Sequence, residues 1–121
     1  MDTLVFVYGS LKKEYHNHLL LEKSKYLGQY STNPEFSMYD LGDFPAITLM
    51  GNTKIYGEVY LVDEETFKRL DKLEGYPRFY NRKVIDVYPV DGSESTKAWV
   101  YFINPEDINL EEDYRIDTGI W

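Results

Sequence analysis

A glutamate occupies a position in an amphipathic helical pattern where an apolar residue is expected. The segment from Phe67 to Arg82 reads FKRLDKLEGYPRFYNR, which predicts the end of a helix, a turn and the start of a strand. At about 100° per residue, Glu74 projects between Phe67 and Leu70, on the face that meets the core. In one interpretation the Glu74 side chain reaches water from a frayed last turn or pairs with a cation such as Arg82. In the other, its carboxyl lies in an apolar cavity lined by Phe67 and Leu70.

The cavity interpretation makes Glu74 a candidate general acid and base. Burial in apolar surroundings disfavours the charged form of a carboxyl and raises its pKa toward neutral pH. Such a carboxyl can both accept and donate a proton under physiological conditions. The helical pattern alone leaves this role and the solvated or ion-paired side chain both open.

A second candidate site is the loop Tyr8-Gly9-Ser10-Leu11, which follows the apolar run TLVFVY. Backbone N–H groups at such a turn can bind a carboxylate or an oxyanion, and Gly9 lets a ligand approach the main chain. An ordinary turn explains the same residues. Ser10 lacks an assignable catalytic triad, so contact with a substrate suits it better than a nucleophilic role.

The remaining polar candidates predict no metal site. His16 and His18 are two residues apart, a spacing that points them away from each other on a helix. No cysteine or carboxylate cluster stands nearby at ligand spacing. The acidic stretch from Glu106 to Asp113 is typical of a solvated surface or a frayed helix.

Composition restricts the class of protein. The chain has 121 residues, 43% hydrophobic and 17% aromatic, which predicts one core and therefore a single domain over residues 1–121. Thirteen basic against twenty-one acidic residues give a formal net charge of -8 without a basic patch, which argues against nucleic acid as a partner.

The absence of cysteine excludes disulfides and fits a reducing compartment. No apolar run approaches a membrane span, and Asp2 stands where a signal peptide needs positive charge, so we expect a cytoplasmic protein with no membrane partner.

Local patterns predict the elements that hold these candidates. A strongly signalled helix runs from Glu64 to Glu74, with Asp63 as its N-cap and Gly75 after its end. A second helix is predicted from about Asn17 to Lys25, with Asn17 as its N-cap and Gly28 as the residue that breaks it. Strands are predicted over residues 3–8, 26–31, 36–41, 46–50, 54–62, 80–90 and 96–104, the last two as an antiparallel hairpin.

Glycines punctuate this pattern and complete the prediction of fold class. The pairs Gly42-Asp43 and Gly51-Asn52 are typical of turns and predict chain reversals. Gly57, in the middle of a strand, suggests a bulge or the close approach of another backbone or a ligand. Many strands with short helices that do not alternate regularly predict an α+β domain with a mixed, barrel-like sheet.

Three segments in order carry a resemblance to a known family. VYGSL near the N-terminus, GEVYLVD before the main helix and LDKLEGYPRFYNRKV after it resemble the γ-glutamylcyclotransferase-like superfamily, in particular its γ-glutamylamine cyclotransferase and AIG2-like branch. Their order and spacing match from Val5 to about Phe102, and the final Gly-Ile-Trp resembles a short signature of many members. The resemblance implies a small barrel with the active site at one end.

The resemblance also implies roles for individual residues. Tyr8, Gly9, Ser10 and Leu11 would present main-chain N–H groups to a γ-glutamyl substrate, and Glu74 would be the catalytic glutamate. Tyr80 would border the site, while Arg82 would support the structure.

The implied reaction is the release of 5-oxoproline and a free amine from a small γ-glutamyl molecule, with no metal or cofactor. A non-catalytic module that binds a small metabolite or a peptide end is the alternative. The stretch from Lys12 to His18 departs from the glycine-containing basic sequence of many relatives, so the amine that leaves is open. A monomer is favoured, although the sequence does not settle the oligomeric state.

Overall fold

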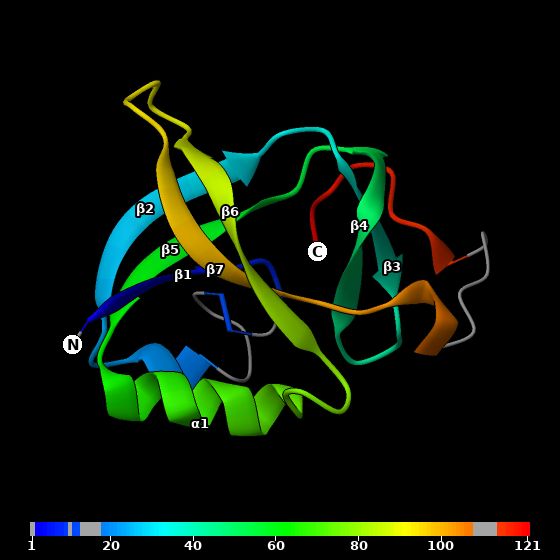
Figure 1. The fold of residues 1–121 in the computed structure, drawn as a ribbon. Helices are drawn as coiled ribbons and strands as arrows, with labels where there is room; N and C mark the ends of the chain where they lie inside the picture. The colour runs from blue at the N-terminus through cyan, green and yellow to red at the C-terminus, as the bar shows by residue number, and fades with distance from the viewer. Residues whose placement is uncertain (1, 10, 13–17, 108–113) are drawn as a thin grey trace.

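The computed structural model describes residues 2–9, 11–12, 18–107 and 114–121 (Figure 1). Their regular elements, in chain order, are β1 (Thr3–Val7), η1 (His18–Leu21), β2 (Lys25–Thr32), β3 (Phe36–Asp40), β4 (Pro45–Thr53), β5 (Tyr56–Val62), α1 (Glu64–Glu74), β6 (Asn81–Pro89), β7 (Thr96–Phe102) and η2 (Pro105–Asp107). Both η elements are single turns of 3-10 helix.

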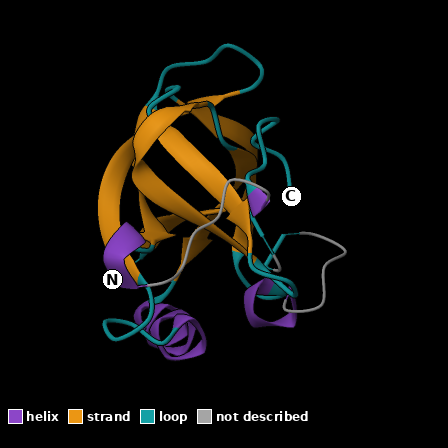
Figure 2. Cartoon of the chain, turned by 90° about the vertical axis from the view of Figure 1, so that its right-hand side faces the viewer, coloured by secondary structure: helices purple, strands orange, loops and turns teal. Residues whose placement is uncertain are grey.

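Five strands close into a barrel in the order β1-β5-β2-β6-β7 (Figure 2). The β1 and β7 strands are parallel and close the barrel at Val5 and Trp99, whereas the other neighbours are antiparallel. The β3 and β4 strands form a separate two-stranded sheet. A mixed barrel with few helices confirms the predicted α+β class.

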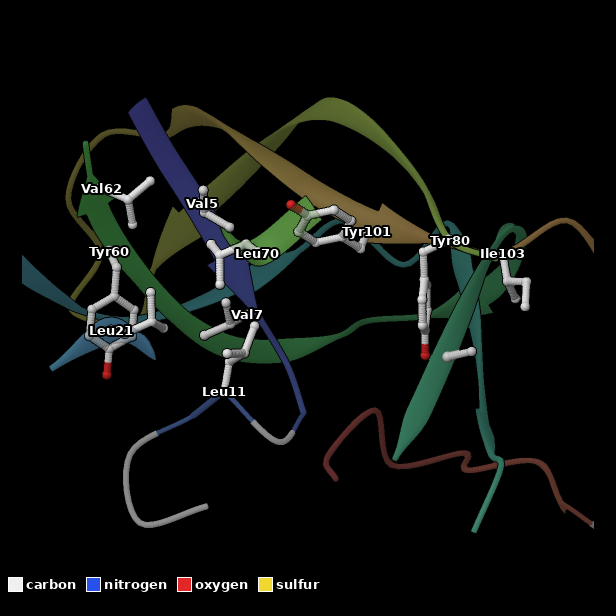
Figure 3. Close-up of a cluster of buried hydrophobic side chains, with 11 residues drawn as sticks. Val5, Val7, Leu11, Leu21, Tyr60, Val62, Leu70, Tyr80, Tyr101 and Ile103 are labelled. Carbon is white, nitrogen blue, oxygen red and sulfur yellow. The ribbon is translucent and has the colours of Figure 1, made fainter. Parts of the chain in front are cut away.

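The core has two parts because side chains alternate across the barrel wall. Val5 and Val7 of β1 belong to one cluster with Leu70 of α1 (Figure 3). The α1 helix lies along the outside of the barrel (Figure 1). Phe6 and Tyr8, on the opposite face of the same strand segment, belong to the second cluster. The first cluster therefore fixes α1 against the outside of β1.

The α1 helix has the predicted bounds and both predicted caps. The Asp63 carboxylate accepts a hydrogen bond from the Thr66 N–H at 2.7 Å. Hydrogen bonding with the Thr66 side chain, and then with its backbone N–H, lowers the pKa of Asp63. Gly75 follows the helix in the left-handed conformation, with φ of 68°. The helix end is thus fixed by local sequence.

The predicted helix from about Asn17 to Lys25 is wrong. Residues 18–21 form only a 3-10 turn, because β2 already begins at Lys25 and pairs there with Leu61 of β5. Asn17, the predicted N-cap, lies outside the described residues. Gly28, predicted to end this helix, instead lies at an irregularity inside β2, with φ of 125°.

The predicted turn at Gly51-Asn52 is also wrong, since both residues lie inside β4. The register of the β3–β4 pair shifts between Phe36 and Ser37, and the Ser37 hydroxyl donates to the Met50 carbonyl at 2.8 Å. A side-chain hydroxyl therefore helps to hold an irregular strand where the sequence pattern suggested a reversal.

Gly57 confirms the predicted close approach of another backbone. A Cβ atom at this position would collide with the Val7 carbonyl of β1. This contact brings β5 close to the end of β1, next to the Tyr8–Leu11 loop. Within the described residues, no helix combines the length and apolar character that crossing a bilayer requires.

Candidate active site

Glu74 is the last residue of α1, and the final turn of this helix is not frayed. The Gly75 N–H donates to the Lys72 carbonyl at 3.2 Å, and the Tyr76 N–H donates to the Asp71 carbonyl at 2.9 Å. This pair of bonds is the Schellman arrangement that satisfies terminal carbonyl groups. The backbone of Glu74 is therefore held in place, which removes fraying as the explanation for its position.

Arg82 pairs with Asp71 and not with Glu74. Its Nε and Nη2 atoms lie 2.8 and 3.2 Å from the two Asp71 carboxylate oxygens. The guanidinium also lies over the rings of Phe67, Tyr76 and Trp99, at 4.6, 4.2 and 4.7 Å from their centroids. Among the described residues, the Glu74 carboxylate makes no ion pair.

The Glu74 side chain lines a pocket of about 190 Å³ at one end of the barrel. The lining is mostly apolar and comprises Phe6, Val7, Tyr8, Gly9, Leu11, Phe44, Pro45, Leu73, Glu74, Phe79, Tyr80 and Tyr101. Phe67 and Leu70, which the helical pattern placed around the cavity, do not line it. Leu70 is fully buried against the barrel. Glu74 lies one turn further along the helix and lines the pocket.

Burial changes the acidity of Glu74. Loss of water around the carboxyl raises its pKa from 4.5 to about 7. The pKa of Tyr8 is also raised, first by burial and then by the nearby Tyr80 and Glu74. A carboxyl with a pKa near neutrality can exchange protons in both directions at physiological pH.

The Tyr8–Leu11 loop forms another wall of this pocket, through Tyr8, Gly9 and Leu11. A Cβ atom on Gly9 would lie 2.7 Å from Cδ of Pro45, so the missing side chain gives room to the Pro45 ring. Within the described part of the chain, the Gly9 and Leu11 N–H groups make no hydrogen bond. Ser10 lies outside the described residues, and its predicted contact with substrate stays a prediction.

Three tyrosine rings line the pocket while their hydroxyls bond elsewhere. The Tyr8 hydroxyl donates to the Tyr101 carbonyl at 2.7 Å, and the Tyr80 hydroxyl donates to the Pro45 carbonyl at 2.6 Å. The Tyr101 hydroxyl donates to Asp71 at 2.7 Å. Tyr101 therefore links Tyr8, the residue after β1, to the helix turn that precedes Glu74. Tyr80, the predicted border residue, contributes mainly its ring.

The pocket is also lined by residues that the sequence pattern did not predict: Phe6, Val7, Phe44, Pro45, Leu73, Phe79 and Tyr101. Phe44 and Pro45 lie where β4 begins, beyond the predicted Gly42-Asp43 turn. No local sequence pattern predicts that this turn packs against Gly9, because the two segments are about 35 positions apart in the chain. The only available signal was the aromatic character of the sequence around the two predicted site segments.

The histidines and carboxylates give no metal site in the part of the chain that the structure describes. His18 Nδ1 lies 3.0 Å from the Leu11 carbonyl oxygen, and its ring is 5.7 Å from that of Tyr60. His18 thus packs behind the loop that lines the pocket. His16 and most of the acidic stretch 106–113 lie outside the described residues.

Almost the whole chain, including the pocket, is similar to a known protein family. The family model described as "Gamma-glutamyl cyclotransferase, AIG2-like" matches residues 5–121. The chain belongs to this family. The match includes every described residue that lines the pocket.

Relatives and solved structures agree with this membership of the gamma-glutamyl cyclotransferase, AIG2-like family. A Vibrio cholerae protein named "Putative gamma-glutamylcyclotransferase" is 40% identical over 125 residues. The aligned region covers 100% of this chain and 96% of the Vibrio protein. The crystal structure of an AIG2-like mouse protein has a TM-score of 0.78 at 27% identity, covering 91% of this chain and 84% of the mouse chain. The crystal structure of YkqA from Bacillus subtilis has a TM-score of 0.79 at 31% identity; it covers all of this chain, which spans 40% of YkqA.

Proposed function

We propose that this chain cyclises a γ-glutamyl amine or γ-glutamyl amino acid, releasing 5-oxoproline and a free amine. The observation that carries the proposal is that Glu74, with a pKa of about 7, shares one small pocket with Gly9 and Leu11. A pocket that only bound a carboxylate would gain nothing from a second carboxylate in its wall. Membership of a cyclotransferase family supports the same reaction.

Glu74 acts as base and then as acid in this proposal. The carboxylate removes a proton from the α-ammonium of the substrate, and the freed nitrogen attacks the γ-carbonyl carbon. The new C–N bond closes a five-membered ring while the original amide C–N bond breaks. The protonated Glu74 then returns its proton to the departing nitrogen, so the carboxylate is regenerated. The ring nitrogen passes its second proton to the released amine, which leaves as an ammonium ion.

The Tyr8–Leu11 loop assists through its backbone. The Gly9 and Leu11 N–H groups, which have no partner among the described residues, are donors available to the oxyanion or to the substrate carboxylate. Nucleophile and carbonyl belong to one molecule, so holding the substrate in its folded form can supply on the order of 7 to 11 kcal/mol. The chemistry needs no redox cofactor. We also propose a cytoplasmic location, which the absence of cysteine supports.

The test is release of 5-oxoproline from a panel of γ-glutamyl amines, γ-glutamyl dipeptides and γ-glutamyl-ε-lysine. We expect turnover of at least one member, and a loss of about 100-fold or more in kcat for Glu74→Gln. Binding of substrate to the Glu74→Gln variant, followed by calorimetry, separates loss of chemistry from loss of fold. No turnover of any member, with binding retained, would instead indicate a non-catalytic binding module.

A further inference from the structure

The pocket is too small for a whole γ-glutamyl amide with a bulky amine. Its volume of about 190 Å³ lies below the roughly 300 Å³ at which sites for drug-sized ligands begin. The γ-glutamyl half must reach Glu74 and the Tyr8–Leu11 loop for the proposed cyclisation, so it occupies the interior. The leaving amine must then lie at the mouth.

The mouth is formed by apolar and aromatic side chains. Leu73 and Phe79 line the pocket and are nevertheless 42% and 37% exposed, which places them at its rim. The Phe79 ring meets those of Phe44 and Tyr80 edge to face, with centroids 6.0 and 5.0 Å apart. These rings present an aromatic wall to whatever lies at the rim.

The side-chain hydroxyls of the described lining already donate to other groups of the protein. The hydroxyls of Tyr8, Tyr80 and Tyr101 donate to protein acceptors. Glu74 is the one charged side chain of the described lining, and the α-ammonium of the substrate engages it. The described rim therefore offers no charged partner to a carboxylate or ammonium on the leaving amine.

We propose that the preferred substrates are γ-glutamyl amides of aromatic or branched apolar amines, with Phe79 as a specificity-determining residue. This inference rests on the proposed cyclisation. An aromatic leaving group adds to the ring cluster of the rim in the edge-to-face or offset geometry that aromatic pairs favour. The amines of amino acids, which carry a carboxylate, gain no such contact.

The test compares kcat/KM for 5-oxoproline release from γ-glutamyl benzylamide, γ-glutamyl ethylamide, γ-glutamyl-ε-lysine and γ-glutamyl alanine. The ratio of benzylamide to ethylamide is measured in the native protein and in Phe79→Ala, because comparing the two ratios removes the intrinsic reactivity of each amide. We expect the ratio to fall about tenfold in Phe79→Ala. Tyr88→Ala is the matched control, since Tyr88 is also 37% exposed but lies outside the pocket; its ratio should equal that of the native protein.

The outcomes separate this inference from the proposed function. Turnover with an unchanged ratio in Phe79→Ala, or a preference of the native protein for γ-glutamyl alanine or γ-glutamyl-ε-lysine, overturns the apolar preference and leaves the cyclisation standing. If no amide releases 5-oxoproline, the cyclisation fails and the inference fails with it. If Phe79→Ala does not fold, Leu73→Ala removes the other partly exposed rim contact, and the same fall in the ratio is expected.

Discussion

Ionisation of the Glu74 carboxyl lowers the stability of the folded chain. Its pKa in the folded state is about 7 against an ordinary value of 4.5, because burial removes water from the carboxyl. The folded state therefore binds more protons than the unfolded state between these two values, and stability falls as pH rises through that window. At about 1.4 kcal/mol per pH unit, the loss above pH 7 is roughly 3 kcal/mol.

This cost predicts a pH-dependent effect of Glu74→Gln, which cannot ionise. Relative to the native protein, the free energy of unfolding of the variant should rise between pH 4.5 and pH 8, by up to about 3 kcal/mol. Urea unfolding of both proteins at each pH measures this difference, and titrations common to both cancel. A difference that stays constant from pH 4.5 to pH 8 would show that Glu74 is not held in an apolar site.

At the scale of elements, Arg82 joins β6 to α1 one turn before Glu74. Both side chains of the Arg82–Asp71 pair are largely buried, at 19% and 20% exposure, so Arg82→Ala leaves a poorly solvated carboxylate without its cation. We expect a loss of about 3 kcal/mol in the free energy of unfolding. Lys68→Ala breaks the exposed Lys68–Glu64 pair and should cost less than about 1 kcal/mol. Similar losses in urea unfolding for both variants would contradict this role of Arg82.

The turn at Gly75 positions Glu74 through the backbone. Gly75 and Gly92 both have positive φ, of 68° and 86°, so alanine at either position should cost about 1 to 2 kcal/mol of stability. Gly75 follows Glu74 directly, whereas Gly92 lies in the β6–β7 turn. We expect kcat/KM to fall in Gly75→Ala alone, measured beside urea unfolding of both variants. Equal activity in the two variants would argue against a positioning role for this turn.

Elements with strong local signals could be predicted from the sequence, and those decided by pairing could not. The caps at Asp63 and Gly75 fixed both ends of α1 because each acts within a few residues. Residues 18–21 have helical composition, yet the pairing of β2 with β5 limits them to a single turn. The irregular course of β4 around Gly51 likewise depends on its partner β3, which no local pattern specifies.

At the scale of the whole molecule, closure of the barrel brings the site together. The Tyr8–Leu11 loop follows β1, Glu74 ends α1 and Tyr80 precedes β6, so residues more than 60 positions apart share one pocket. Sequence reasoning could single out Glu74, because a carboxylate on an apolar helix face breaks a local pattern, and the resemblance indicated the loop. The aromatic rim could not be predicted, because Phe44 lies about 35 positions before Phe79 and Tyr80 in the sequence and meets them only in the folded chain.

The pH dependence of kcat/KM for 5-oxoproline release by the native protein tests the assignment of Glu74 as base and acid. If Glu74 is the base and then the acid, the rate should rise through a midpoint of about pH 7 as its carboxyl ionises. At alkaline pH the substrate amine and Glu74 are both deprotonated, so no proton is available for the leaving amine and the rate should fall again. A profile that is flat from pH 5 to pH 8, or that has its acidic midpoint near 4.5, would contradict the assignment of Glu74.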